Sequence, residues 1–365
     1  MEKILLAAPV LGRSGGIAVW SKAYLANFPN DEFQLVPVDI TKKVKGVNTS
    51  ITKRVYYGLK LMFDVLKRTK RTLNENPDIR IMHTTTSGDI GTLRDYYMVK
   101  LCHRRGLKCI MHCRYGCIPE DFRSKGFKGR LLRKTMRLYD NIWVLDSRSL
   151  NALKEDPILK NKVFLTPNSI PVPSTCEIQP KRYEKIAYIA HLIPTKGLYE
   201  LTEAVVKSKL DIELLLVGPG EQEIVDKIQA IAGFKYGSKI KVLGRQPNDE
   251  AMKILQSVDI MALPTYYPWE GFPISILEAM SRGKLVISCP RAAIPDMLTA
   301  SDGSKCGVLV KEKSTEDIEK ALVWISEHKT ECDEMCKKAY EKVRTAYDTT
   351  VVYNLYRKLY RDLLQ

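Results

Sequence analysis

Residues 270–279 have the sequence E-G-F-P-I-S-I-L-E-A and lead from a loop into a short helix. The apolar run Ile260–Leu263 lies shortly before them and predicts a buried strand. Pro273 and Gly283 are placed to begin and end a helix over residues 275–282, because proline suits the first helical turn and glycine the position after the last. Strand, loop and helix in this order are typical of the repeating unit of an α/β protein.

This stretch contains two glutamates in unusual positions. Glu270 falls in the loop, and Glu278 falls in the expected helix among apolar residues, where a charge is uncommon unless it has a partner. The backbone N–H groups at the start of the helix have no acceptor within the helix and can face a ligand. The pattern therefore favours a binding site, with two surface glutamates on an ordinary helix as the alternative.

Length and composition predict a globular protein with two domains. The chain has 365 residues, 45% of them hydrophobic and 27% charged. No stretch is long and apolar enough to span a membrane, and Met1–Pro9 is too short for a secretory signal. The nine cysteines are irregularly spaced, so we expect reduced thiols and a cytoplasmic protein.

Positive charge is concentrated in the first half of the chain. Residues 1–180 hold 31 lysines and arginines against 16 acidic residues, whereas the remainder holds 27 against 26. Almost all of the net charge of +16 therefore belongs to the first half. This half is expected to meet an anionic partner.

The first half begins with the pattern of a doubly wound α/β domain. Lys3–Pro9 predicts a strand, residues 12–16 a glycine loop, Ile17–Phe28 a helix and Phe33–Val38 a second strand. The loop does not fit G-x-G-x-x-G, so a dinucleotide site has little support. Its glycines still allow a ligand to approach the backbone closely.

Two basic segments, residues 53–71 and 123–137, combine lysine and arginine with regularly spaced apolar residues. We interpret them as basic amphipathic elements, which suit an anionic membrane surface. A solvated basic face is the alternative. Nucleic acid is the least favoured partner, because neither a known binding motif nor an aromatic stacking platform is visible.

His112 is a candidate site residue in the first half. It ends an expected strand, Leu107–Cys113, and precedes a loop, which is a position typical of a ligand cleft. A core histidine is the alternative. The Cys and His residues between 102 and 117 contain no C-x-x-C pair, and no D-x-D pair follows a strand, so neither spacing predicts a metal site.

Four prolines between residues 167 and 180 indicate a stiff connector. We predict a first domain over residues 1–172, joined by a returning helix at 349–365, then a linker at 173–182 and a second domain at 183–348. The second domain repeats the α/β pattern, with a strand at Lys185–Ala190 and a helix at Gly197–Lys207. Lys196 precedes this helix, where its charge and the free N–H groups can hold a phosphate.

The second half resembles the family-4 retaining glycosyltransferases, which have two Rossmann-like domains in the GT-B architecture. The strongest match is residues 270–287, which resemble the E-x7-E signature of that family. Further matches are A-H-L-I-P-T-K-G at 190–197, L-L-V-G-P-G at 215–220, L-G-R at 243–245 and T-P-N-S-I at 166–170. The first half matches in the order and type of its elements, with His112 and the 15–16 glycine pair as its anchors.

The resemblance implies a role for each matched residue. Glu278 would accept hydrogen bonds from the ribose of a nucleotide sugar, and Lys196 would neutralise the departing diphosphate. Glu270 would hold the donor sugar, and His112 would lie beside the donor sugar and the acceptor oxygen. The remaining implied donor-binding residues are Gly15, Gly16, His191, Arg245, Gly271, Phe272, Pro273 and Ile274.

One residue departs from the family pattern. His191 stands where the family usually has arginine. Arginine is always charged, whereas histidine is charged only near or below a pKa of about 6.5. The resemblance therefore implies that stabilisation of the leaving group rests mainly on Lys196, with Arg13 or Arg245 able to compensate.

From this resemblance we expect a retaining hexosyltransferase that requires neither a metal nor another cofactor. Its expected donor is a nucleotide sugar, preferably of UDP with GDP as the alternative, and its acceptor is a glycan or a lipid-linked saccharide in cell-surface polysaccharide synthesis. The basic first half would then contact the inner face of the cell membrane. Three other functions remain open: a nucleotide-binding scaffold on an impaired transferase fold, a nucleotide-sugar epimerase and a nucleic-acid-binding protein.

Overall fold

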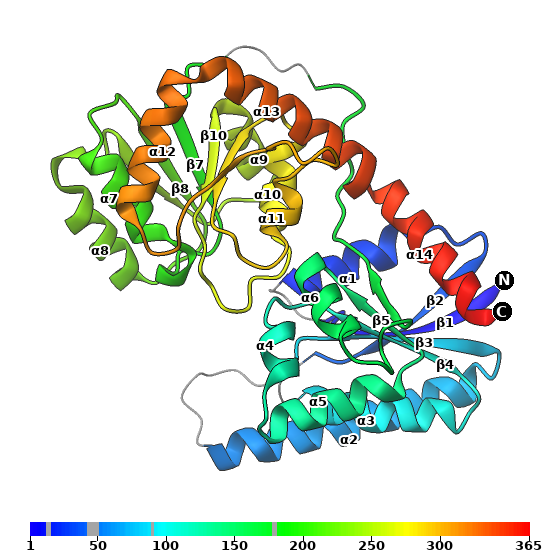
Figure 1. Ribbon diagram of the computed structural model, residues 1–365. Helices are drawn as coiled ribbons and strands as arrows, with labels where there is room; N and C mark the ends of the chain where they lie inside the picture. Colours follow the sequence, from blue (N-terminus) through cyan, green and yellow to red (C-terminus); the bar gives the residue numbers. More distant parts are fainter. Residues whose placement is uncertain (12–15, 42–50, 89–90, 177–180) are drawn as a thin grey trace. The chain divides into compact units, whose positions relative to one another are not determined.

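The computed structural model describes residues 1–11, 16–41, 51–88, 91–176 and 181–365 (Figure 1). These residues form two compact units. Unit 1 consists of Met1–Pro167 and Tyr353–Gln365, and unit 2 consists of Asn168–Val352. Residues 177–180 of the expected linker lie outside the described residues, and the predicted domain bounds stay a prediction.

Unit 1 is built on a six-stranded parallel sheet with the order β2-β1-β3-β4-β5-β6. In β1, Leu5 pairs with Val36 on one side and with Met82 on the other. Helices cover both faces of such a sheet, which explains why strands such as β1 contain continuous apolar runs. The strands are β1 (Glu2–Ala8), β2 (Phe33–Asp39), β3 (Ile79–Thr86), β4 (Lys108–Cys113), β5 (Asn141–Val144) and β6 (Val163–Leu165).

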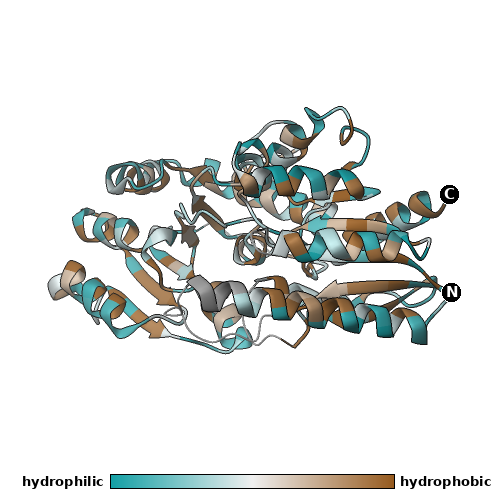
Figure 2. Ribbon diagram, turned by 90° about the horizontal axis from the view of Figure 1, so that it is seen from below, coloured by the Kyte–Doolittle hydropathy of each residue, from teal (hydrophilic) through white to brown (hydrophobic). Residues whose placement is uncertain are grey.

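The helices of unit 1 lie on both faces of this sheet (Figure 1). On one face α2, α3 and α5 pack over a core that includes Met82, Val99 and Met136. Figure 2 shows the strands mostly in the hydrophobic colour, whereas the helices alternate between the two colours. The helices are α1 (Gly16–Asn27), α2 (Ile51–Glu75), α3 (Gly91–His103), α4 (Ile118–Arg123), α5 (Phe127–Leu138) and α6 (Ser147–Lys154).

The structure corrects the prediction of one amphipathic element over residues 123–137. This segment spans two helices, because α4 ends at Arg123 and α5 begins at Phe127. Gly129 on α5 explains the close packing of the two helices, since a Cβ there would lie only 2.1 Å from the carbonyl oxygen of Ser124. The other basic segment, residues 53–71, lies within the single helix α2, as expected.

Unit 2 repeats the architecture with a second six-stranded parallel sheet, ordered β12-β11-β10-β7-β8-β9. Its strands are β7 (Lys185–Ile189), β8 (Glu213–Val217), β9 (Ile240–Gly244), β10 (Ile260–Leu263), β11 (Leu285–Ser288) and β12 (Val308–Leu309). The two sheets confirm the predicted class of two Rossmann-like α/β domains.

The connections of unit 2 are mainly helical. Its longer helices are α7 (Leu198–Lys207), α8 (Gln222–Ala232), α9 (Asn248–Ser257), α12 (Thr315–Glu327) and α13 (Lys329–Lys342). Its short ones are η1 (Pro194–Lys196), η2 (Gly233–Lys235), α10 (Ile274–Met280), α11 (Ile294–Met297) and η3 (Val343–Tyr347).

The last helix, α14 (Thr349–Leu364), returns to unit 1, as predicted. The hydroxyl of Tyr360 lies 2.7 Å from the hydroxyl of Tyr24 and 2.5 Å from Nδ1 of His83, and all three side chains are buried. Arg357 and Arg361 of the same helix form ion pairs with Glu32. Residues 353–365 therefore complete the core of unit 1.

Candidate functional site

The predicted site residues of unit 2 gather where its strand order reverses. The chain passes from β7 to β8 and β9 on one side of the sheet and returns to β10 on the other side of β7. The loops after β7 and β10 therefore diverge at this point, which is where doubly wound sheets bind ligands. The first loop carries His191 and Lys196, and the second carries Glu270.

Lys196 and Glu270 form an ion pair. Nζ of Lys196 lies 3.0 Å from Oε2 of Glu270, and the two side chains are only 16% and 10% exposed. The hydroxyl of Thr265 donates a hydrogen bond of 3.2 Å to the same carboxylate oxygen. The pair neutralises both charges within the protein, so an anion that binds Lys196 must compete with Glu270.

Gly197 allows the loop that bears Lys196 to lie against the loop after β10. Its φ angle is +74°, and a Cβ atom at this position would lie 2.1 Å from the carbonyl oxygen of Pro264. Because Gly197 is left-handed, the predicted helix over 197–207 begins one residue later, at Leu198. Lys196 is the last residue of η1 and is held at the end of this tight turn.

Hydrogen bonds to the backbone of residues 271–274 hold this segment in place. The side-chain amide of Asn168 donates a 2.9 Å hydrogen bond to the carbonyl oxygen of Phe272. The carbonyl oxygen of Gly271 accepts an N–H from the turn before α11. Helix α10 begins at Ile274, directly after Pro273, and ends at residue 280, whereas the sequence predicted 275–282. These contacts hold the segment rigidly before the helix that carries the second glutamate.

Glu278 lies on α10 between the buried residues Leu277 and Ala279. Burial raises the pKa of its carboxyl group to about 7, and the charge of Arg282 partly opposes this shift. Arg282 also donates a 3.0 Å hydrogen bond to the backbone oxygen of Glu278. A carboxyl group with such a pKa is about half ionised at neutral pH, so donors from a ligand can shift it to the charged form.

The charges of Lys196 and Arg245 act on His191. Burial and the charges of Lys196 and Arg245 lower the pKa of His191. His191 is therefore neutral at pH 7, and the positive charge of this cluster resides on Lys196 and Arg245.

Gly218 explains how these loops come together. A Cβ atom at Gly218 would lie 1.8 Å from the carbonyl oxygen of Ala190, so only glycine permits this approach. The N–H of Gly218 donates a 2.8 Å hydrogen bond to the carbonyl oxygen of Gly244. The loops that carry His191 and Arg245 are thus joined through the glycine of the L-V-G-P-G segment.

The predicted site residues of unit 1 are placed less directly. Gly15 lies outside the described residues, as does Arg13. Gly16 is the exposed first residue of α1, and a Cβ atom there would meet open space.

His112 is fully buried in β4, and both of its ring nitrogens face protein groups. Its Nδ1 lies 3.1 Å from Nε2 of His83, and a guanidinium nitrogen of Arg114 donates to its Nε2 at 3.1 Å. Burial and the charge of Arg114 lower its pKa well below the usual value, so it is neutral. These contacts are those of the core histidine that the sequence left as the alternative, and its role beside a sugar stays a prediction.

Two residues of the site were not proposed from the sequence. Thr265, which contacts Glu270, follows the buried strand β10, and this position was the signal that could have identified it. Asn168, which contacts Phe272, lies in the T-P-N-S-I segment that was noted only as a family match.

The basic helices of unit 1 carry exposed apolar side chains beside their charges. On α2, Tyr56 and Phe63 are 62% and 64% exposed, and on α5, Phe127 is 74% exposed. Exposed cations nearby in sequence include Lys60, Lys67, Lys70, Lys125, Lys128, Arg130 and Lys134. Within the described ranges, no helix combines the length and apolar character that crossing a membrane requires.

Residues 177–342 match the model of the family described as glycosyl transferases group 1. The amylovoran biosynthesis glycosyltransferase AmsK of Erwinia amylovora is 27% identical over 176 residues, which are 46% of this chain and 42% of AmsK. An N,N'-diacetylbacillosaminyl-diphospho-undecaprenol alpha-1,3-N-acetylgalactosaminyltransferase of Campylobacter jejuni is 28% identical over 181 residues, 49% of this chain and 45% of that enzyme. The chain thus matches somewhat less than half the length of these curated relatives.

Solved structures share the fold over the full length of the chain. Sucrose-phosphate synthase from Thermosynechococcus elongatus superimposes with a TM-score of 0.76 at 14% identity and covers 100% of this chain and 99% of its own. Anabaena Alr3699/HepE in complex with UDP and glucose superimposes with a TM-score of 0.68 at 13% identity, covering 99% and 100%. At these identities the likeness establishes the GT-B fold.

Proposed function

Because the chain belongs to the glycosyl transferases group 1 family, we propose that it transfers a hexose from a nucleotide sugar to an acceptor hydroxyl with retention of anomeric configuration. The observation that carries this proposal is the Lys196–Glu270 ion pair at the point where the strand order of unit 2 reverses. A cation and a carboxylate held side by side suit a substrate that presents a diphosphate and sugar hydroxyls together.

In the proposed reaction Lys196 binds the diphosphate and stabilises the negative charge that develops as it departs. Glu270, released from Lys196, accepts hydrogen bonds from hydroxyl groups of the donor sugar. The backbone of Gly271, Phe272, Pro273 and Ile274 holds the same sugar, with free N–H groups as donors. The acceptor hydroxyl attacks from the face of the leaving group, and a diphosphate oxygen takes its proton. Glu270 is then a positioning group and not a nucleophile, and catalysis depends on orientation and charge.

Glu278 is proposed to accept hydrogen bonds from the ribose hydroxyls. Its carboxyl group is about half protonated near pH 7 in the protein alone. Two hydroxyl donors stabilise the carboxylate form, so binding of the nucleotide lowers the pKa of Glu278 and releases a proton. Arg245, and His191 in its neutral form, complete the proposed contacts with the nucleotide.

The proposed reaction requires no metal ion. The cations Lys196 and Arg245 act on His191 from nearby and provide positive charge where the diphosphate would lie. The sequence contains no aspartate pair after a strand that would hold a metal–diphosphate complex. We therefore expect transfer to continue in the presence of EDTA.

UDP is the proposed nucleotide, and a lipid-linked saccharide is the proposed acceptor. The solved Anabaena structure contains UDP and glucose, and the name of the Campylobacter relative includes a diphospho-undecaprenol acceptor. The net charge of residues 1–180 and the exposed Phe63 and Phe127 beside lysines suit an anionic membrane surface. We propose a cytoplasmic enzyme that binds peripherally to the inner face of the membrane through α2 and α5.

The test is a thermal-shift panel of nucleotides and nucleotide sugars, with and without EDTA, on the wild type and Glu278→Ala. A ligand at a hundredfold excess over its Kd stabilises the native state by about 2.7 kcal/mol. We expect a shift with the sugars of one nucleotide that is insensitive to EDTA and lost in the variant. Transfer of labelled sugar to a lipid-linked acceptor then measures the reaction itself.

One observation favours the alternative of a nucleotide-binding scaffold on an impaired transferase fold: the pKa of His191 is lowered, so this position lacks the usual positive charge. A scaffold would bind the nucleotide but release no sugar, even in a His191→Arg variant that restores the usual cation. An enzyme whose activity is limited by this position would instead gain activity in His191→Arg. Binding of oligonucleotides that is unaffected by Glu278→Ala would favour the nucleic-acid alternative.

A further inference from the structure

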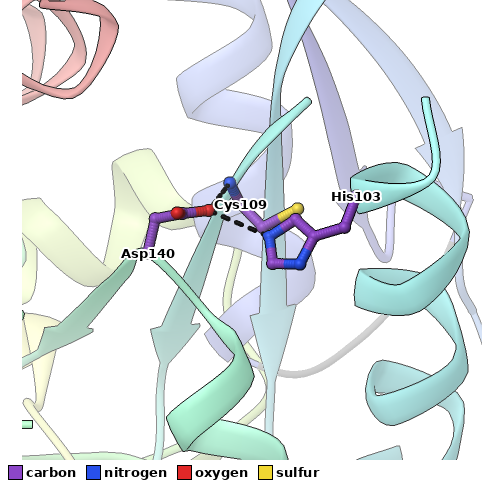
Figure 3. Close-up of side chains that lie close together, drawn as sticks. All are labelled: His103, Cys109 and Asp140. Carbon is purple, nitrogen blue, oxygen red and sulfur yellow. Dashed lines mark hydrogen bonds and ion pairs between the residues drawn. The ribbon is translucent and has the colours of Figure 1, made fainter. Parts of the chain in front are cut away.

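Three side chains with metal-binding atoms meet at the edge of the unit 1 sheet where its strands begin (Figure 3). Sγ of Cys109, a ring nitrogen of His103 and a carboxylate oxygen of Asp140 all lie within 4.8 Å of one another. In the part of the chain that the structure describes, no other group of three His, Cys, Asp or Glu residues does so. We propose that these residues form a binding site for a divalent transition-metal ion of the zinc type.

The three residues come from three elements of unit 1. His103 is the last residue of α3, Cys109 is the second residue of β4, and Asp140 lies between α5 and β5. Two hydrogen bonds attach Asp140 to the backbone of Cys109 in β4. The N–H of Asp140 donates to the carbonyl oxygen of Cys109 at 3.0 Å, and the carboxylate of Asp140 accepts a bond from the N–H of Cys109 at 2.8 Å. Asp140 and Cys109 are therefore held in place before any ion binds.

His103 is oriented by the same carboxylate. Its Nε2 lies 3.0 Å from Oδ2 of Asp140, and Figure 3 shows its ring beside the sulfur of Cys109. The side chains of His103 and Asp140 are 37% and 28% exposed, whereas Cys109 is fully buried. An ion can thus enter from the solvent side, while the thiol forms the inner wall of the site.

The spacing suits a tetrahedral ion after a small adjustment. Bonds of about 2.0 Å to nitrogen and oxygen and about 2.3 Å to sulfur place tetrahedral ligands roughly 3.3–3.6 Å apart. The observed limit of 4.8 Å requires the widest pair to close by about 1.3 Å at most. The side chains of His103 and Asp140 are partly exposed, and their rotation can supply this movement.

The donor set selects the class of ion. A thiolate and an imidazole favour zinc-type ions, whereas magnesium and calcium prefer sites made of oxygen atoms alone. Cys109 must lose its proton as the ion binds, and the proton passes to solvent. Burial and the neighbouring Cys102 and Asp140 raise the pKa of the Cys109 thiol.

The proposed ion would join α3, β4 and the α5–β5 turn and would stabilise unit 1. It takes no part in the proposed transfer, because the predicted donor-binding residues of unit 2 belong to other loops. The spacing of the Cys and His residues between 102 and 117 did not predict this site, because only two of them, His103 and Cys109, belong to it. Asp140 is distant in sequence and completes it.

The experiment titrates Co²⁺ into the full-length protein after treatment with EDTA and records the thiolate-to-cobalt absorption band. Zn²⁺ is then added to displace the cobalt, and a chromophoric chelator measures the affinity. The variants are Cys109→Ser, His103→Ala and Asp140→Asn. Cys117→Ser, at a half-buried cysteine of the same unit, and His328→Ala, in unit 2, are the matched controls.

We expect one equivalent of Co²⁺ to bind with a thiolate band that Zn²⁺ abolishes. The band should be absent in Cys109→Ser and unchanged in both controls. His103→Ala, which removes a partly exposed side chain and should leave the fold intact, should weaken binding at least roughly tenfold. No saturable binding in the wild type, or a band that survives in Cys109→Ser, would overturn the proposal and leave an ordinary His103–Asp140 hydrogen bond. UDP binding that is unchanged by metal removal separates this result from the proposed function.

Discussion

The raised pKa of Glu278 makes a quantitative prediction about donor binding. If the ribose hydroxyls require the carboxylate form, binding must weaken as the pH falls through the pKa of about 7. The experiment measures the Kd of the donor at pH 8 and at pH 6, for the wild type and for Glu278→Gln. Glutamine keeps the shape and one acceptor oxygen of the side chain but cannot titrate.

The size of the effect follows from the pKa. At pH 8, one unit above a pKa of about 7, roughly ten carboxyl groups in eleven are ionised, and at pH 6 roughly one in eleven. The Kd should therefore be about tenfold higher at pH 6 than at pH 8, which is about 1.4 kcal/mol of binding free energy. Glu278→Gln should bind more weakly at pH 8 and show almost no change with pH.

Isothermal titration calorimetry with UDP-glucose suits this measurement, because its diphosphate is esterified at both ends and keeps its charge across this range. Protonation of His191 would change the affinity in the opposite direction, since a positive charge gained at low pH would strengthen binding of an anion. The His191→Gln background removes this contribution. Equal affinity at pH 6 and pH 8 in that background, or an unchanged pH dependence in Glu278→Gln, would refute the assignment of Glu278 to the ribose.

Three further predictions concern single side chains. Lys196→Ala should abolish transfer and lower stability by about 1–3 kcal/mol, because Glu270 is left as a largely buried charge; adding Glu270→Gln should restore stability in urea unfolding without restoring transfer. Gly197→Ala should cost more than about 1 kcal/mol, because its φ is positive and its Cβ would contact Pro264; a stability equal to wild type would contradict the close approach. Tyr360→Phe should destabilise unit 1 by about 1–3 kcal/mol through the loss of two buried hydrogen bonds, while UDP binding by the folded protein should remain normal in calorimetry.

The sequence predicted most strands of the two sheets, because many buried parallel strands have continuous apolar sequences. Ile260–Leu263, for example, is a strand whose residues are all fully buried. The sequence did not predict β3, an inner strand of the unit 1 sheet, whose sequence IRIMHTTT is interrupted by polar residues. Boundaries that depend on tertiary contacts were less accurate. The break between α4 and α5 depends on Gly129 packing against the backbone of Ser124, and no local periodicity reports such a contact.

The sequence analysis named the residues of the candidate site one by one, and their roles stay predictions; it did not predict the contacts among them. Lys196 and Glu270 are 74 positions apart, and only the parallel pairing of β7 with β10 brings their loops together. His112 was assigned by its place at a strand end, which does not reveal the buried His83 and Arg114 beside it. Contacts between residues this far apart depend on the order of the strands in the sheet. Local patterns in a single sequence do not reveal that order.

The return of α14 to unit 1 also sets the order of events during synthesis. Tyr24 and Tyr360 are partners across 336 positions, so unit 1 leaves the ribosome without the residues that complete its core. At about 5–20 residues per second, unit 2 takes roughly 10–40 s to be translated before Tyr353 is added. During this interval the nascent unit 1 lacks the aromatic side chains of α14 that contact Tyr24 and Phe28, and the apolar surface around these two residues stays uncovered. The continuous second unit has all of its residues available by that time and can fold first.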